Sequence, residues 1–104
     1  MSGIPSAPGR SVLRVVVPRF PLGRLVVTAN VLRHLLPDDI QTAVCRHLAG
    51  DWGDLDEHDR QENERALVLG NRLLSVYRGA NGTRLYVITE SGFALTTVLL
   101  PEDY

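Results

Sequence analysis

The chain has 104 residues and a mass of 11.5 kDa, with 44% hydrophobic and 22% charged residues, which suits one small globular domain. This composition excludes a collagen, a coiled coil, a disulfide scaffold and a membrane span. Eleven basic residues nearly balance twelve acidic ones, for a net charge of -1, which argues against a generally basic nucleic-acid binder. All the basic residues are arginine, and the absence of lysine removes phosphate-loop and Schiff-base chemistry.

Cysteine usage indicates a reducing compartment. Cys45 is the only cysteine, so neither an intramolecular disulfide nor a CxxC zinc motif is possible. The apolar stretch near residues 12–17 is too short for a bilayer span and is interrupted by Arg14, so we expect no signal peptide. The expected location is the cytoplasm, without membrane binding and without a cofactor.

The first half of the chain predicts a tail, strands and two helices. Residues 1–10 are rich in Gly, Pro and Ser and predict a flexible tail, followed by a single domain over residues 11–104. Residues 11–17 and 24–28 are rich in β-branched side chains, which favours strands. Two helices follow, one capped by Asn30 and one that starts at Asp38 or Asp39 and ends before Gly50.

The second half predicts one more helix and then a sheet. A helix is expected from Asp56 to Leu69, followed by strands at residues 72–78, 83–90 and 95–100. The Asn81-Gly82 pair between the first two of these strands is a strong hairpin signal. The predicted fold class is therefore α+β, with about three helices on one face of an antiparallel sheet of three to five strands, in the order β(β)αααβββ.

Charge is unevenly distributed along the chain. Residues 1–46 contain six arginines and two acids, whereas residues 51–65 contain seven acids and two arginines. The acidic segment is polar over most of its predicted helix, so it is either solvated or covers a partner. We expect a binding surface there, formed by Trp52, Asp54, Asp56, Glu57, Asp59 and Glu62. Trp52 itself has two interpretations, as an anchor of the core or as an interface hot spot.

Two alternative functions follow from other residues. A small ribonuclease of the barnase or RelE-like kind would use His58, Tyr77, Arg84 and Glu90 to move protons and hold phosphate. A nucleic-acid-binding arm would use Arg10, Arg14, Arg19 and Arg24. Against the ribonuclease stands a simpler interpretation, in which Arg84 and Glu90 are ordinary exposed strand residues. Against the arm stands the expected burial of Arg14 in its strand.

The acidic segment does not match a calcium loop. A loop that starts at Asp51 places Asp56 where Gly is needed, and one that starts at Asp54 places Arg65 where a bidentate Glu is needed. His58 lies among acids but has no partner at zinc-ligand spacing. We therefore expect no metal site.

Several motifs in combination resemble a family of small proteins of bacterial plasmids and integrative elements, usually labelled plasmid-related proteins. The resemblance spans residues 22–104 and rests on Gly50-Asp51-Trp52-Gly53-Asp54-Leu55, Asn63-Glu64, Ala66-Leu67, Arg72-Leu73-Leu74-Ser75-Val76-Tyr77, Val87-Ile88-Thr89-Glu90 and the run from Thr96 to Tyr104. Where that family continues with Ala-Asp-Arg-Ser, this chain has Ser91-Gly92-Phe93-Ala94.

The resemblance implies a mobile-element setting, and the missing acid and arginine weaken an enzyme assignment. We expect a non-enzymatic interaction protein of a mobile genetic element. Its partner is expected to be a protein, such as a host defence complex that it inhibits through the acidic surface, with nucleic acid as the alternative partner.

Overall fold

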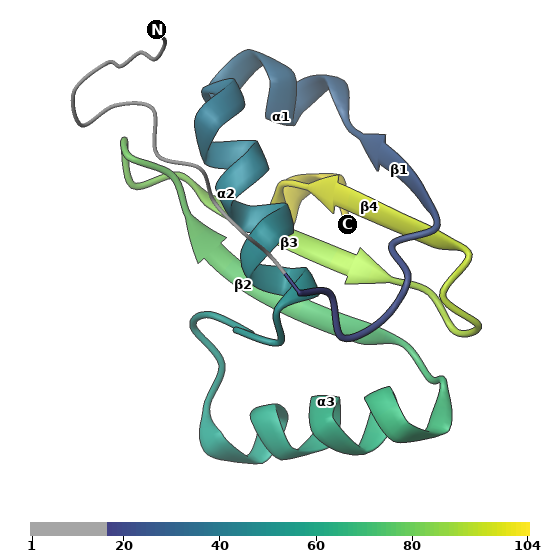
Figure 1. The fold of residues 1–104 in the computed structure, drawn as a ribbon. Helices are drawn as coiled ribbons and strands as arrows, with labels where there is room; N and C mark the ends of the chain where they lie inside the picture. The colour runs from purple at the N-terminus through teal and green to yellow at the C-terminus, as the bar shows by residue number, and fades with distance from the viewer. Residues whose placement is uncertain (1–16) are drawn as a thin grey trace, which may run out of the picture.

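A computed structural model of the chain describes residues 17–104 (Figure 1). The elements in chain order are β1 (Arg24–Val27), α1 (Ala29–His34), α2 (Pro37–Leu48), α3 (Glu57–Leu69), β2 (Leu73–Arg78), β3 (Arg84–Thr89), β4 (Leu95–Leu99) and the short 3-10 helix η1 (Pro101–Asp103). The predicted α+β class with three helices is confirmed. The predicted tail and all but the last residue of the strand predicted at residues 11–17 lie outside the described residues, and Val17 itself is not in a strand.

The four strands form one sheet in the order β1-β4-β3-β2. β2, β3 and β4 form the predicted antiparallel meander, and the hairpin turn contains Gly82 with a φ of 84°. β1 pairs with β4 in parallel, so the sheet is mixed and not wholly antiparallel as predicted. The three helices and two strands between β1 and β4 form a long connection, and such a connection allows a parallel pair.

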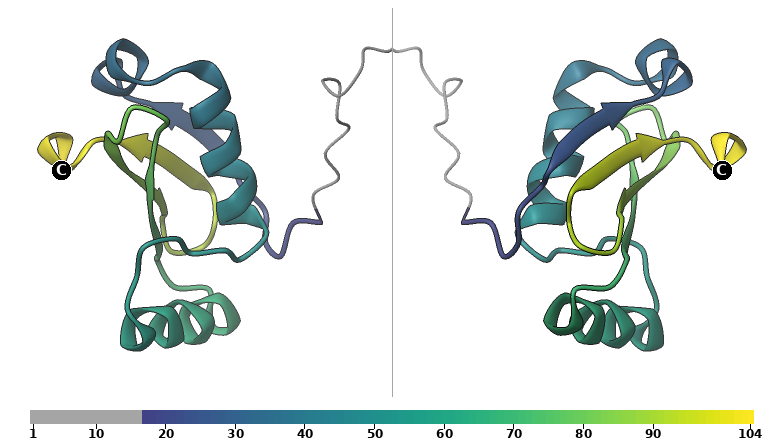
Figure 2. Two further views of the ribbon diagram at one scale, coloured as in Figure 1. Left: turned by 90° about the vertical axis from the view of Figure 1, so that its left-hand side faces the viewer. Right: turned by 90° about the vertical axis from the view of Figure 1, so that its right-hand side faces the viewer.

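Helices α1 and α2 cover one face of the sheet, and the opposite face is open over β2 and β3. Seen along the sheet, α2 lies on one side and η1 with the C-terminus on the other (Figure 2). The main core forms between the helices and the covered face, and its fully buried members include Val31, Leu85, Val87 and Val98. The strand alternation predicted from the sequence therefore sends Leu85 and Val87 inward and leaves Tyr86 on the open face.

The helix ends differ by a few residues from those predicted. Thr28, not Asn30, caps α1, because its hydroxyl accepts the N–H of Val31 at 3.3 Å. α2 starts at Pro37, where a missing N–H costs nothing, and the two aspartates occupy its first turn. α3 begins one residue after the predicted start, and Asp56 is its cap, accepting the N–H of Asp59 at 2.8 Å. None of the helices within residues 17–104 has the length and apolar character needed to cross a bilayer.

The outer edge of β2 is closed by side-chain and loop contacts. The Asn63 side chain of α3 donates to the carbonyl of Leu74 at 2.6 Å and accepts its N–H at 3.2 Å. Further along, Gly53 bridges Val76 in parallel, and the N–H of Asp54 donates to the Val76 carbonyl at 2.8 Å. These contacts satisfy backbone groups that an edge strand otherwise exposes.

Replacing Asn63 by Ala should lower the free energy of unfolding by about 2 kcal/mol, because the N–H and C=O of Leu74 both lose their partner. Urea unfolding followed by tryptophan fluorescence measures the change. Asn71→Ala is the matched control, since Asn71 is exposed. Equal losses for the two variants would show that the Asn63 amide does not hold the edge.

Candidate functional site

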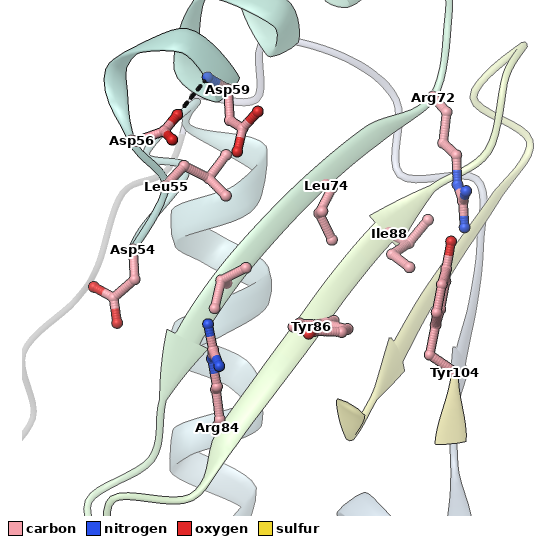
Figure 3. A pocket seen from close by; sticks show the side chains of 11 residues that line it. Asp54, Leu55, Asp56, Asp59, Arg72, Leu74, Arg84, Tyr86, Ile88 and Tyr104 are labelled. Carbon is pink, nitrogen blue, oxygen red and sulfur yellow. Dashed lines mark hydrogen bonds between the residues drawn. The ribbon is translucent and has the colours of Figure 1, made fainter. Parts of the chain in front are cut away.

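The open face of the sheet carries a hollow of about 550 Å³ (Figure 3). Its floor is formed by Leu74, Val76, Tyr86 and Ile88, which alternate outward from β2 and β3. Leu74 on the edge strand β2 is 36% exposed and Tyr86 is partly exposed, whereas Val76 and Ile88 are only 5% and 3% exposed. No helix within residues 17–104 covers this floor, so the side chains of Leu74 and Tyr86 remain accessible on it.

The two sides of the hollow carry opposite charge. On the side of α3 stand Asp54, Asp56 and Asp59, and across the floor stands Arg72, whose guanidinium lies 5.5 Å from the ring centre of Tyr104 (Figure 3). Arg84 closes the end at the start of β3. The hollow therefore has an acidic side, an apolar floor and a basic side.

The charged groups of the hollow are only loosely neutralised by the protein itself. Asp54 lies 3.5 Å from the Arg78 guanidinium, and Arg72 lies 3.5 Å from Glu90, with all four side chains about half exposed. Exposed pairs at this distance contribute little free energy, so a ligand can replace them at low cost. For Arg84 no acidic partner is present within residues 17–104.

The predicted acidic surface divides into two groups. Asp54, Asp56 and Asp59 line the hollow, whereas Glu57 and Glu62 do not. Glu57 accepts a hydrogen bond from Gln61 at 3.2 Å and Glu62 pairs with Arg65, both along the exposed side of α3. The structure thus brings together three of the five predicted acids in one site.

Trp52 belongs to the core, not to the acidic surface. Its side chain is 2% exposed and packs with Phe20 and Leu73. The indole N–H donates to Glu64 at 2.9 Å, and Arg19 binds the same carboxylate at 3.0 and 2.9 Å. These hydrogen bonds hold the pKa of the Glu64 carboxyl below its usual range. Of the two interpretations of Trp52, the structure supports the core anchor.

The four residues of the ribonuclease alternative do not meet. Tyr77 is buried on the helix-covered face, where its hydroxyl donates to the Asp51 carbonyl, and burial raises the pKa of its phenol. Arg84 begins β3, and Glu90 follows the end of the same strand. His58 is exposed on α3, 3.5 Å from Asp59. A general acid–base site needs its groups within hydrogen-bond reach of one substrate, which this arrangement does not provide.

Asp56, His58 and Asp59 offer ligand atoms that lie within 4.8 Å of one another, all of them exposed. An Asp56 oxygen already accepts the Asp59 N–H as the helix cap. Exposed acids at a helix start are favoured by the helix dipole without any ion, so this cluster needs no metal to explain it.

A buried histidine lies in the last turn of α2. His47 is fully buried, and its ring lies edge-on to those of Phe20 and Trp52, with the ring centres 5.2 and 5.8 Å apart. Its spacing of three and four residues from the buried Val44 and Ala43 is the signal that places it on the inner face of α2.

The hydrogen bonds of His47 form a chain with one direction. Thr96 donates to the Leu22 carbonyl at 2.7 Å, so its oxygen accepts the hydroxyl of Thr89 at 2.7 Å. Thr89 is then the acceptor of the His47 Nε2–H at 2.9 Å, and Nδ1 lies 2.6 Å from the Ser75 oxygen. Burial lowers the pKa of His47 to about 4, which favours the neutral imidazole. We therefore infer a neutral ring with its proton on Nε2, in which Nδ1 accepts the Ser75 hydroxyl.

The pairing of Ser75 with His47 has the form of a nucleophile and its base, but both side chains are fully buried. A substrate carbonyl cannot reach them without opening the core, so this network is structural.

The structure describes two of the four arginines of the nucleic-acid alternative. Arg10 and Arg14 lie outside the described residues. Arg19 is paired with Glu64, which raises the pKa of its guanidinium, and Arg24 is exposed at the start of β1.

The comparison of this chain with protein-family models, with curated proteins and with solved structures finds no match.

Proposed function

We propose that the protein is a non-enzymatic interaction protein and that it binds a segment of a partner polypeptide in the hollow of the open sheet face. The observation that carries this proposal is the side-by-side placement of three exposed carboxylates and an apolar floor on which Leu74 and Tyr86 are accessible. The acidic side would receive a basic side chain of the partner, and the floor would receive a neighbouring apolar one.

The geometry favours a polypeptide over a nucleic acid. A nucleic acid laid across the floor would bring its phosphates against Asp54, Asp56 and Asp59, which repel them. A polypeptide can place a basic group on that side and an acidic group near Arg72 and Arg84. Arginine suits the latter role, because its planar guanidinium binds a carboxylate through two parallel hydrogen bonds.

We also propose that this interaction serves a mobile genetic element, for example by occupying a surface of a host defence complex. The sequence motifs that resemble plasmid and integrative-element proteins support this setting. Two residues of these motifs lie in the loop before α3. Trp52 anchors this loop in the core, and Asp54 lines the hollow.

Neutralising the acidic side should weaken partner binding about tenfold, which corresponds to about 1.4 kcal/mol. The test variant is Asp56→Asn with Asp59→Asn, which keeps side-chain size and leaves an Asn able to cap α3. The readout is affinity capture from the source cell, quantified by mass spectrometry at several salt concentrations.

The matched control is Glu57→Gln with Glu62→Gln, which removes the same charge from the same helix outside the hollow. Capture should fall for the hollow variant alone. Equal capture by wild type and both variants across all salt concentrations would contradict the proposal.

A further inference from the structure

The outer edge of β1 differs from the closed edge of β2. The N–H of Arg24 donates to Ala94 at 2.9 Å and that of Thr28 to Val98 at 3.0 Å, so alternate residues of β1 point toward β4. By strand alternation, the N–H and C=O groups of Leu25 and Val27 point outward. Apart from the hydrogen bonds between β1 and β4, no backbone hydrogen bond within residues 17–104 involves the N–H or C=O of Leu25 or Val27.

Apolar side chains accompany this open edge. Leu25 is 42% exposed and Val26 39% exposed, and Leu32 of α1 is 64% exposed nearby. Between β1 and α2 runs a groove of about 310 Å³ that contains no charged residue, lined by Leu25, Val27, Leu32, Pro37, Ile40, Gln41, Val44 and Cys45. An open strand edge with apolar flanks is a template for pairing with another strand.

We propose that two copies of the chain associate by antiparallel pairing of β1 with β1, in a register centred on Val26. Directly opposed residues of two antiparallel strands point to the same face, and Leu25 points to the helix-covered face. Leu25 can therefore pair only with Leu25 or with Val27 of the second copy. Pairing of Leu25 with Val27 lets the outward N–H and C=O groups of both residues form hydrogen bonds with the other copy, and pairing of Leu25 with Leu25 does not. The register centred on Val26 therefore satisfies the whole free edge.

Charge complementarity favours a second copy as the occupant. In this register Arg24 lies across from Thr28 of the second copy. The Thr28 hydroxyl donates to the Asp103 carboxylate at 2.7 Å, and Asn30 donates to the same carboxylate at 2.6 Å. Each end of the pairing thus places one guanidinium near one carboxylate of the other copy. The two Arg24 side chains lie at opposite ends and do not repel each other.

This association is independent of the proposed partner binding. The hollow lies over β2 and β3, and β1 is separated from β3 by β4. Both copies keep an open floor in the joined sheet, so failure of one proposal leaves the other standing.

Sedimentation equilibrium of the full chain should show a concentration-dependent dimer. Val26→Lys should weaken the dimer at least tenfold, because two ammonium groups face each other at the centre of the register. Arg24→Glu should weaken it too, and that effect should shrink at high salt. Circular dichroism checks that both variants fold. A wild-type chain that stays monomeric at its highest soluble concentration would overturn the proposal.

Cysteine cross-linking tests the register itself. Opposed Val26 residues form a non-hydrogen-bonded pair with Cα atoms about 4.5 Å apart, which a disulfide can bridge. In a Cys45→Ser background, Val26→Cys should therefore form a disulfide-linked dimer on mild oxidation. Leu74→Cys is the control, since Leu74 is similarly exposed but lies on the strand at the other end of the sheet. Equal cross-linking of the two variants, or none at residue 26, would exclude this register.

Discussion

Acidification from pH 7 to pH 4 should lower the free energy of unfolding by about 3 kcal/mol through His47 alone. Burial lowers the pKa of this imidazole from 6.5 to about 4 in the folded protein. Between these two values the unfolded chain binds a proton that the folded chain does not. The free energy of unfolding is therefore unaffected by the titration of His47 above pH 6.5, and it falls as the pH decreases from 6.5 toward 4. Each pH unit in this window costs about 1.4 kcal/mol.

Urea unfolding at a series of pH values, followed by Trp52 fluorescence, measures this dependence. The His47→Gln variant should be less stable at pH 7 but should lose much less stability between pH 6.5 and 4.5. His58→Gln is the matched control, since His58 is exposed on α3, and its profile should follow that of the wild type. Parallel profiles for wild type and His47→Gln in this window would contradict the assignment of a buried neutral imidazole.

The second large effect is expected at Gly53. Gly53 has a φ of 78°, and a Cβ atom there would overlap the Val76 carbonyl oxygen and press on the Tyr77 ring. Gly53→Ala should therefore lower the free energy of unfolding by about 3 kcal/mol or more, through backbone strain and overpacking together. The change also breaks the bridge between Gly53 and Val76, which holds the acidic loop against β2.

Gly82→Ala separates the two causes. Gly82 has a similar φ of 84°, but a Cβ atom there meets nothing within 4 Å. This variant should lose only the strain, about 1 to 2 kcal/mol. Thermal or urea unfolding of both variants provides the comparison. A loss at Gly53 no larger than the loss at Gly82 would show that the loop moves away from β2 without cost.

Local signals in the sequence predicted much of the fold. The Asn81-Gly82 turn and the alternation of the following strand lie in one short stretch, so the hairpin could be placed without knowing the rest of the chain. The same holds for α3, where Asp56 acts as the cap and Gly70 ends the helix with a φ of 74°.

Features that depend on distant contacts could not be predicted in this way. The parallel partner of β1 lies about seventy residues further along the chain, and no local pattern specifies such a pairing. His47 lies near the end of a helix, where a surface position is common, and only its hydrogen bonds to Ser75 and Thr89 explain its burial. Trp52 was open to two interpretations because its environment depends on Phe20 and Leu73.

The sequence predicted the acidic side of the candidate site but not the hollow. The excess of acids over arginines in residues 51–65 is visible in the sequence, and it includes Asp54, Asp56 and Asp59. Their position beside Leu74 and Tyr86 results from the way the closed edge of β2 holds α3 against the sheet. Part of that edge is closed by the Asn63 amide, whose role the sequence did not indicate.

The most direct test of the central claim is site-specific photo-cross-linking from the floor of the hollow. A photoreactive phenylalanine derivative at Tyr86 reports what contacts the floor, and the same group at Val68, exposed on α3, is the control. The proposed function predicts a discrete protein adduct from residue 86 in the source cell, absent from residue 68 and lost with Asp56→Asn and Asp59→Asn. No adduct at residue 86, or one that survives these substitutions unchanged, would contradict it.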